Sequence, residues 1–243
     1  MKNTKNTSVK EAIMTDILGV IGGMGPMAGV YFCELITKKT SAFSDTEHID
    51  MVLASFPRVP DRTAYLLDKS NPSPVDAILR MGNLLVSQGC TVIAVPCVTS
   101  FALYDEYAPA LNANIIHMPD EVAKSLSTQG VKTAGILATD GTVKTGVLQS
   151  SLEKQGIKAV IPDTEHQKMV MSVIYDQVKK GVPVDKEMFL RICDHMLSLG
   201  AEKIILGCTE LSLVFRGEHP KSCVDAMEVL AEACIKTMGK QVR

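Results

Sequence analysis

Two short stretches of the sequence match each other, and together they restrict the fold more than any other feature. Each is an apolar run that leads directly into a cysteine: Val95-Pro96-Cys97-Val98-Thr99-Ser100 in the first half and Leu206-Gly207-Cys208-Thr209-Glu210 in the second. Short apolar runs are typical of buried parallel strands, and the hydroxyl residues that follow favour the start of a helix. We therefore expect both cysteines at the carboxyl ends of strands, where open α/β sheets bind ligands.

The segments before the two cysteines are similar in length, which suggests an internal duplication. Gly19-Val20-Ile21 precedes a glycine-rich turn, and Gly135-Ile136-Leu137 precedes a second turn that contains glycine. Cys97 lies 78 residues after Gly19, and Cys208 lies 73 residues after Gly135. Two related halves in a pseudo-twofold arrangement would turn the two thiols toward each other.

Strands and helices are predicted to alternate along the whole chain. Strands are expected over residues 17–21, 49–56, 91–95, 114–118, 132–138, 157–161 and 203–206, and residues 57–63 are expected to form a loop. Helices are expected over residues 26–39, 74–88, 143–155, 164–180 and 185–199, from residue 119 onward, and from a cap at Asp225 to Met238. This alternation predicts an α/β protein with mainly parallel sheets.

Composition and charge exclude several classes of function. The chain has 243 residues and a net charge of −2, so it lacks the basic surface that nucleic acids and anionic membranes attract. No apolar run is long enough to span a bilayer. The seven cysteines form no dense pairing pattern and the five histidines have no metal-binding spacing. We therefore expect a reduced, cytoplasmic compartment and no metal, with no nucleic-acid or membrane partner.

A facing pair of thiols suits inversion at a carbon that bears an acidic hydrogen. One base removes the proton from one face while an acid delivers a proton to the other, and identical groups exchange these roles when the reaction reverses. A free thiol has a pKa of about 8.5, close enough to neutrality for either role. Free cysteines are most often small buried hydrophobes, and we expect that of Cys33, Cys90, Cys193, Cys223 and Cys234.

Charged residues near the expected ligand-binding edge add candidates for substrate binding. Arg62 follows the second predicted strand, and a guanidinium there can hold a carboxylate through two parallel hydrogen bonds. Its neighbour Arg58 is more typical of a solvated loop. Lys179 lies at the end of a predicted helix, where a cation also complements the helix dipole.

A rival interpretation comes from the first glycine-rich turn. Gly23-Met24-Gly25-Pro26-Met27-Ala28 fits the dinucleotide-binding pattern G-x-G-x-x-A, which would make the protein a nicotinamide or flavin oxidoreductase. The acidic residue that this pattern requires at the end of the second strand is missing, because the chain there reads Ser55-Phe56-Pro57-Arg58. The pattern is therefore only partly matched, and an oxidoreductase stays an alternative that a titration with a nicotinamide cofactor would test.

Taken in order and spacing, several pieces of the chain resemble the aspartate/glutamate racemase family. The resemblance covers nearly all of the chain after residue 14. The pieces that carry it are Ile21-Gly22-Gly23-Met24-Gly25-Pro26, Pro60-Asp61-Arg62-Thr63, Pro96-Cys97, Ile174-Tyr175 with Lys179, and Gly207-Cys208-Thr209-Glu210-Leu211. The first turn and Glu210 resemble the aspartate racemase branch more than the cell-wall glutamate racemases, which typically carry Asp-Ser and His at these places.

The resemblance implies two similar three-layer α/β domains related by a pseudo-twofold, with the active site in the cleft between them. A flexible tail over residues 1–14, a first lobe over residues 15–117 and 216–243, and a second lobe over residues 118–215 are expected. A homodimer is also expected, although no residue indicates its interface.

For the site, the resemblance implies cofactor-independent racemisation of an amino acid or a related small carboxylate. Cys97 and Cys208 would be the opposing acid and base. The residues expected to bind substrate are Met24, Arg62, Val98, Thr99, Ser100, Lys179, Thr209 and Glu210.

Three residues depart from the family pattern. Val98 stands where the family usually has Asn, Phe101 where it has His, and Ser212 where Pro is common. Val98 removes the donors and the acceptor of an amide from the pocket, so a substrate with a less polar side chain is conceivable. Two further alternatives stay open: a related isomerase or decarboxylase with a single active cysteine, and a ligand-binding protein descended from a racemase.

Overall fold

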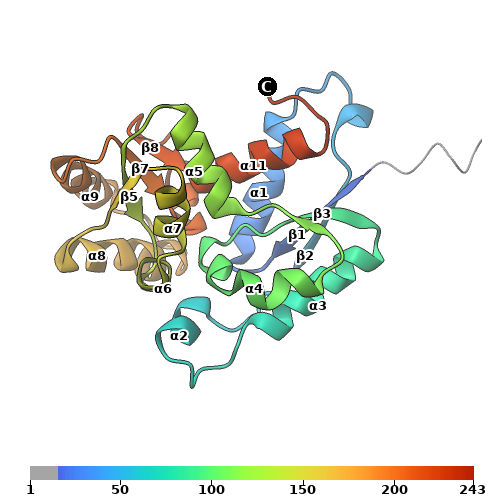
Figure 1. Cartoon of the computed structure of the whole chain (residues 1–243), viewed down its shortest axis with the longest axis horizontal. Helices are drawn as coiled ribbons and strands as arrows, with labels where there is room; N and C mark the ends of the chain where they lie inside the picture. The colour runs from blue at the N-terminus through green and yellow to red at the C-terminus, as the bar shows by residue number, and fades with distance from the viewer. Residues whose placement is uncertain (1–15) are drawn as a thin grey trace, which may run out of the picture.

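The computed structural model describes residues 16–243 and contains two four-stranded parallel sheets (Figure 1). The first sheet has the order β2-β1-β3-β4 and consists of β1 (Ile17–Gly22), β2 (Met51–Ser55), β3 (Cys90–Ala94) and β4 (Asn114–Ile115). The second has the order β6-β5-β7-β8 and consists of β5 (Thr133–Leu137), β6 (Lys158–Val160), β7 (Lys203–Leu206) and β8 (Cys223–Asp225). The strand order is the same in both halves, which is the pattern that a duplication produces, and the predicted α/β fold class is confirmed.

Helices cover both faces of each sheet. The α-helices are α1 (Pro26–Lys39), α2 (Arg62–Leu67), α3 (Val75–Ser87), α4 (Tyr104–Tyr107), α5 (Met118–Thr128), α6 (Asp140–Thr145), α7 (Val147–Lys154), α8 (Thr164–Met171), α9 (Lys186–Ser198), α10 (Thr209–Phe215) and α11 (Ala226–Thr237). Short 3₁₀ helices are η1 (Asp45–Glu47), η2 (Val98–Leu103) and η3 (Ala108–Ala110), and η4 (Ser172–Val178) is a π-helix. In the first sheet, the connection from β1 to β2 moves in one direction across the sheet and the connection from β2 to β3 moves in the other. Because such connections are right-handed, α1 and α3 lie on opposite faces of this sheet.

A shared apolar core holds the two sheets together. Helix α11 packs against both α1 and α5, and α5 packs in turn against α7. As a result one continuous cluster of buried side chains includes Ile93 of β3, Ile136 of β5 and Ile205 of β7. A second cluster, which contains Val173 and Phe189, fills the far side of the second sheet beneath η4 and α9.

The structure differs from the sequence-based elements at several places. The expected loop at residues 57–63 is present over residues 57–61 but ends at Arg62, where helix α2 starts, because the Asp61 carboxylate accepts a hydrogen bond from the Ala64 backbone N–H and caps the helix. Strand β8 was not predicted, because three residues carry no periodic pattern. The expected strand at 114–118 ends at Ile115, and His117 already caps α5.

Two predicted helices also change in form. Residues 139–142 are not a separate turn, because the Thr139 hydroxyl caps helix α6, and Gly146 with a φ of 70° separates α6 from α7. The helix expected over 164–180 is α-helical only to Met171 and continues as a π-helix. The predicted cap at Asp225 is present, since its carboxylate accepts from the Met227 N–H.

The division into lobes stays a prediction, and two contacts bear on its C-terminal boundary. β8 pairs with β7 in the second sheet, although it lies within the segment 216–243 that we assigned to the first lobe. Helix α11, from the same segment, packs against α1. The segment therefore contributes to both halves. The predicted tail, residues 1–14, lies outside the described residues.

Within residues 16–243, no helix combines the length and the apolar character that crossing a membrane requires.

The glycine-rich turn after β1 has a packing role. Gly23 has a φ of +87°, and a Cβ atom there would lie 2.5 Å from the backbone of Phe56, which directly follows β2. The turn that leads into α1 thus lies against the end of the neighbouring strand, with no room for a side chain. Close packing explains this glycine without a bound dinucleotide.

We predict that Gly23→Ala lowers the free energy of unfolding by about 3 kcal/mol or more, because left-handed strain and a backbone clash act together. Urea unfolding measures the loss. Gly130→Ala is the matched control, since Gly130 has a φ of +77° but nothing within 4 Å of an added Cβ. It should cost only about 1 kcal/mol. Equal losses in both variants would contradict the close-packing explanation.

Candidate active site

The two matched cysteines line a single cavity between the two sheets. Cys97 follows β3 and Cys208 follows β7, which are the equivalent strands of the two halves. Both side chains are largely buried, and both line one small cavity of about 10 Å³. Short helices begin directly after them, η2 at Val98 and α10 at Thr209. The sequence therefore delivers one thiol from each half to the same small space.

Most of the predicted substrate-binding residues line this cavity too. They are Met24, Arg62, Val98, Thr99, Lys179, Thr209 and Glu210. Ser100 does not line it; its hydroxyl donates a 2.7 Å hydrogen bond to the Cys97 carbonyl oxygen. Ser100 thus shapes the backbone behind Cys97.

Cys97 lies beside a buried guanidinium. Arg62 is only 8% exposed; its Nη1 donates to the Pro60 carbonyl at 3.1 Å, while its Nε is buried without a hydrogen-bond partner. Burial acts to lower the pKa of Arg62, but Cys97 and the Asp61 and Glu210 carboxylates outweigh it and raise this pKa. The cavity therefore contains a permanent positive charge beside the Cys97 sulfur.

Cys208 has the opposite surroundings. Its Sγ donates a 3.0 Å hydrogen bond to Oε2 of Glu210. Burial, together with the charge and the hydrogen bond of Glu210, raises the pKa of the Cys208 thiol well above its usual value, and the charge of Lys179 opposes this only in part. Cys208 is therefore a neutral thiol at pH 7.

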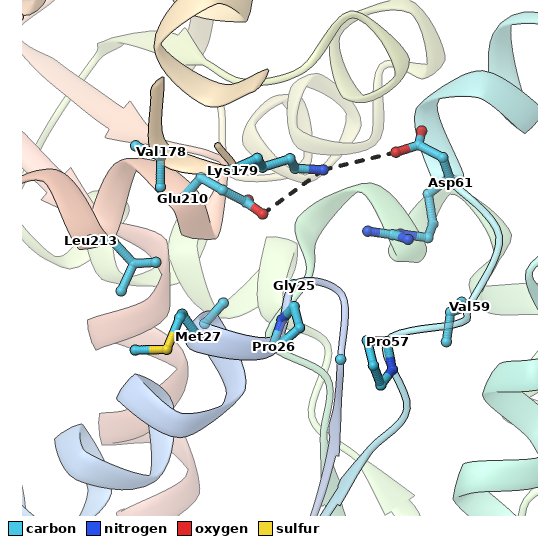
Figure 2. A pocket seen from close by; sticks show the side chains of 13 residues that line it. Gly25, Pro26, Met27, Pro57, Val59, Asp61, Val178, Lys179, Glu210 and Leu213 are labelled. Atoms are coloured by element: carbon cyan, nitrogen blue, oxygen red, sulfur yellow. Dashed lines mark ion pairs between the residues drawn. The ribbon is translucent and has the colours of Figure 1, made fainter. Parts of the chain in front are cut away.

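Charged side chains from both halves meet where the cavity opens outward (Figure 2). Lys179 Nζ lies 3.8 Å from Asp61 Oδ2 and 3.9 Å from Glu210 Oε1, and 4.2 Å from the centre of the Tyr175 ring. The Tyr175 hydroxyl donates to Asp61 Oδ2 at 3.2 Å. Burial acts to raise the pKa of Asp61, but the Ala64 N–H and the charges of Arg62 and Lys179 lower it overall. Asp61 is thus an ionised carboxylate of the first half, and its contacts with Tyr175 and Lys179 of the second half form a bridge between the two halves.

An outer pocket of about 450 Å³ adjoins this bridge (Figure 2). Asp61, Arg62, Lys179 and Glu210 line both the outer pocket and the inner cavity. The remaining lining of the outer pocket is mainly apolar and comes from Pro26, Met27, Ala28, Pro57, Val59, Val178 and Leu213. Four charged side chains are therefore common to the outer pocket and the cavity that contains the thiols.

Buried threonine hydroxyls connect the two halves below the thiols. Thr63 donates to Thr139 at 3.0 Å, and Thr99 lies 2.9 Å from Thr142 and 3.2 Å from Thr139, oxygen to oxygen. Thr63 and Thr99 come from the first half, whereas Thr139 and Thr142 follow β5 of the second. These hydrogen bonds fix the loop after β3 relative to the loop after β5.

Sequence reasoning did not assign a site role to four residues that line the cavity, namely Asp61, Thr63, Thr139 and Tyr175. Asp61 and Thr63 belong to the motif Pro60-Asp61-Arg62-Thr63, and Tyr175 belongs to the motif Ile174-Tyr175. These motifs carried the family resemblance, so the sequence did contain a signal for these three residues. Thr139 lies in the loop after β5. This strand has the same place in the second sheet as β1 has in the first, and that equivalence becomes visible only when the two strand orders are compared.

The fold and this cavity define a two-lobed α/β protein in which one cysteine from each half lines a shared cavity. The Asp/Glu/hydantoin racemase family matches residues 21–234, and the chain belongs to this family.

Individual relatives agree with this membership. The aspartate racemase of Picrophilus torridus has 32% sequence identity and a TM-score of 0.80, covering 94% of this chain and 96% of its own. An aspartate racemase homologue from Pyrococcus horikoshii OT3 has 23% identity and a TM-score of 0.74, covering 93% and 100%. The broad specificity amino-acid racemase RacX of Bacillus subtilis is 25% identical over 91% of this chain and 97% of its own length.

The comparison also separates two branches of the family. Glutamate racemase structures align with TM-scores of 0.57 to 0.64, below those of the two aspartate racemase structures. The predicted resemblance to the aspartate racemase branch is therefore confirmed at the level of the fold.

We predict that Glu210→Gln lowers the pKa of the Cys208 thiol, because the substitution removes a negative charge next to the sulfur. The measurement is the rate of iodoacetamide alkylation of Cys208 against pH, in a Cys97→Ser background. The rise of the rate with pH should move to lower pH in the Gln variant. The control is Glu218→Gln in the same background, an exposed position on the loop after α10. An unchanged pH profile for Glu210→Gln would show that the carboxylate does not act on Cys208.

Proposed function

We propose that this protein is a cofactor-independent amino-acid racemase in which Cys97 and Cys208 act on opposite faces of the substrate Cα. The observation that carries the proposal is that two thiols from equivalent strands share one small cavity with unlike electrostatic surroundings. Membership of the Asp/Glu/hydantoin racemase family supports an isomerase that acts on a small amino acid. A cytoplasmic location and a homodimer, both expected from the sequence, belong to the same proposal.

The unlike surroundings give each cysteine a starting role. Cys97, beside Arg62, begins as the thiolate base, and Cys208, which donates to Glu210, begins as the thiol acid. For one enantiomer, the Cys97 thiolate removes the Cα proton and the electron pair moves into the α-carboxylate. The Cys208 thiol then delivers its proton to the opposite face of Cα. The step ends with Cys97 as a thiol and Cys208 as a thiolate, and the other enantiomer starts from this state.

Arg62 is suited to hold the substrate carboxylate. Its Nε is the one buried nitrogen of this side chain without a hydrogen-bond partner, and the guanidinium reaches both the inner cavity and the outer pocket. A carboxylate bound there gains two charge-assisted hydrogen bonds, and these strengthen as negative charge develops on its oxygens. Asp61 and Glu210 are the nearby acceptors for the substrate ammonium group.

Isotope exchange tests the reaction directly. We expect purified protein in D₂O to incorporate deuterium at Cα of at least one amino acid from a panel of D- and L-enantiomers, detected by NMR. Cys97→Ala and Cys208→Ala should each reduce racemisation by about 1,000-fold or more, because each removes an obligatory proton carrier.

Cys33→Ala serves as the control for this experiment, since Cys33 lies on the α1 surface away from the cavity. It should retain full activity. Absence of exchange with every amino acid, or full activity in either cavity variant, would refute the two-thiol racemase.

Replacing Arg62 tests the carboxylate site. We predict that Arg62→Lys lowers kcat/KM by about 10- to 100-fold, because an ammonium cannot reproduce the paired hydrogen bonds of the guanidinium. Steady-state racemisation measured by circular dichroism gives the value. Arg58→Lys is the matched control, because Arg58 is exposed and lies outside the cavity. A loss of similar size in both variants would mean that Arg62 has no special role.

A further inference from the structure

Two histidines and an aspartate meet on the surface of the second lobe, away from the cavity. Asp163 caps the N-terminus of α8, His166 lies in the first turn of α8, and His195 lies near the end of α9. One nitrogen of each histidine and one carboxylate oxygen lie within 4.8 Å of one another. In the part of the chain that the structure describes, no other three residues of metal-ligating type converge in this way.

The three side chains lie close together, and one of their nitrogen atoms lacks a hydrogen-bond partner. His166 Nδ1 lies 2.8 Å from Asp163 Oδ1, and His195 Nε2 lies 3.5 Å from Asp163 Oδ2. The two imidazole rings are parallel, with centres 3.6 Å apart. His195 Nε2 is buried and has no hydrogen-bond partner. A buried nitrogen without a hydrogen-bond partner, close to a carboxylate oxygen and on a ring stacked against a second imidazole, is an unfilled polar position.

We propose that Asp163, His166 and His195 bind a divalent transition-metal ion of the Zn²⁺ type. Imidazole nitrogen and carboxylate oxygen are ligands that Zn²⁺ accepts, whereas Ca²⁺ and Mg²⁺ prefer oxygen ligands alone. Around Zn²⁺, with bonds of about 2.1 Å, tetrahedral ligand atoms lie about 3.4 Å apart. The rings need to tilt from their parallel stack to aim their lone pairs at one point. The broad torsion about the Cβ–Cγ bond of histidine permits this tilt.

Such an ion would join two helices. α8 and α9 pack against each other, and only His195 belongs to α9. Three protein ligands leave one tetrahedral position for water, which the exposure of Asp163 allows. α8 continues through η4 to Tyr175 and Lys179, so the ion would anchor the far end of the helical segment that reaches the cavity. The inference does not depend on racemisation.

Calorimetric titration with Zn²⁺ tests the site. The protein is used without a histidine tag, stripped of metal by a chelator, and in a Cys97→Ser/Cys208→Ser background so that the cavity thiols cannot bind zinc. We expect one Zn²⁺ per chain. We also expect the thermal unfolding midpoint to rise by about 5 to 10 °C at roughly a hundredfold excess over the dissociation constant. Co²⁺ should give a spectrum without a thiolate charge-transfer band.

Variants identify the ligands. His166→Asn and His195→Asn should each weaken Zn²⁺ binding at least tenfold, and Asp163→Asn provides a third test if either variant folds poorly. His117→Asn is the matched control: His117 Nδ1 also pairs with an aspartate three residues away, Asp120 Oδ2 at 3.0 Å, but no second histidine joins that pair. It should leave the affinity unchanged. No saturable binding, a thiolate band with Co²⁺, or equal binding by all variants would overturn the site.

Discussion

The fixed separation of the loops after β3 and β7 is the constraint on which the site depends. Each loop carries one thiol, and neither half of the molecule contains a complete cavity. Helices α5 and α11 provide the apolar core that spans both sheets, and the threonine hydroxyl cluster ties the loop after β3 to the loop after β5, the strand beside β7. Hydrophobic burial sets the approximate distance between the halves, and directional hydrogen bonds set the final alignment. A shift of one half against the other would separate the sulfurs.

Duplication supplies the matched positions, and later divergence supplies the difference between them. The two strand orders are the same, and both cysteines follow the equivalent strand. Their partners are not equivalent: Arg62 comes from the segment after β2, whereas Glu210 lies two residues beyond Cys208 on α10. Symmetry of the backbone therefore coexists with an asymmetric charge distribution. In the proposed reaction, racemisation in both directions needs two proton carriers. A defined resting state also needs the two thiols to differ in their electrostatic surroundings, so that one starts as the base and the other as the acid.

Local signals in the sequence predicted much of the fold, and long-range contacts account for what was missed. Apolar runs indicated seven of the strands, and the position of Cys97 and Cys208 after such runs placed each at the carboxyl end of a strand. Strand β8 is visible only through its pairing with β7. Likewise, His166 and His195 are 29 residues apart on different helices, so no spacing rule joined them. Position and charge indicated Arg62 and Lys179 as candidates and the resemblance gave them a binding role, but neither predicted the hydrogen bond from Tyr175 to Asp61.

Lys179 can offset the negative charge that the unlike surroundings of the two cysteines concentrate near Cys208. In the proposed racemisation, Cys208 gives up its proton and leaves a thiolate beside the Glu210 carboxylate, and two buried negative charges at that distance repel strongly. Lys179 lies 3.9 Å from Glu210 Oε1, and its charge acts to lower the pKa of the Cys208 thiol. Its other carboxylate partner, Asp61, also bonds to Tyr175, which keeps the ammonium between the two halves. Lys179 is therefore placed to offset the charge that moves to Cys208 in the forward step, as Arg62 offsets the charge on Cys97 in the reverse step.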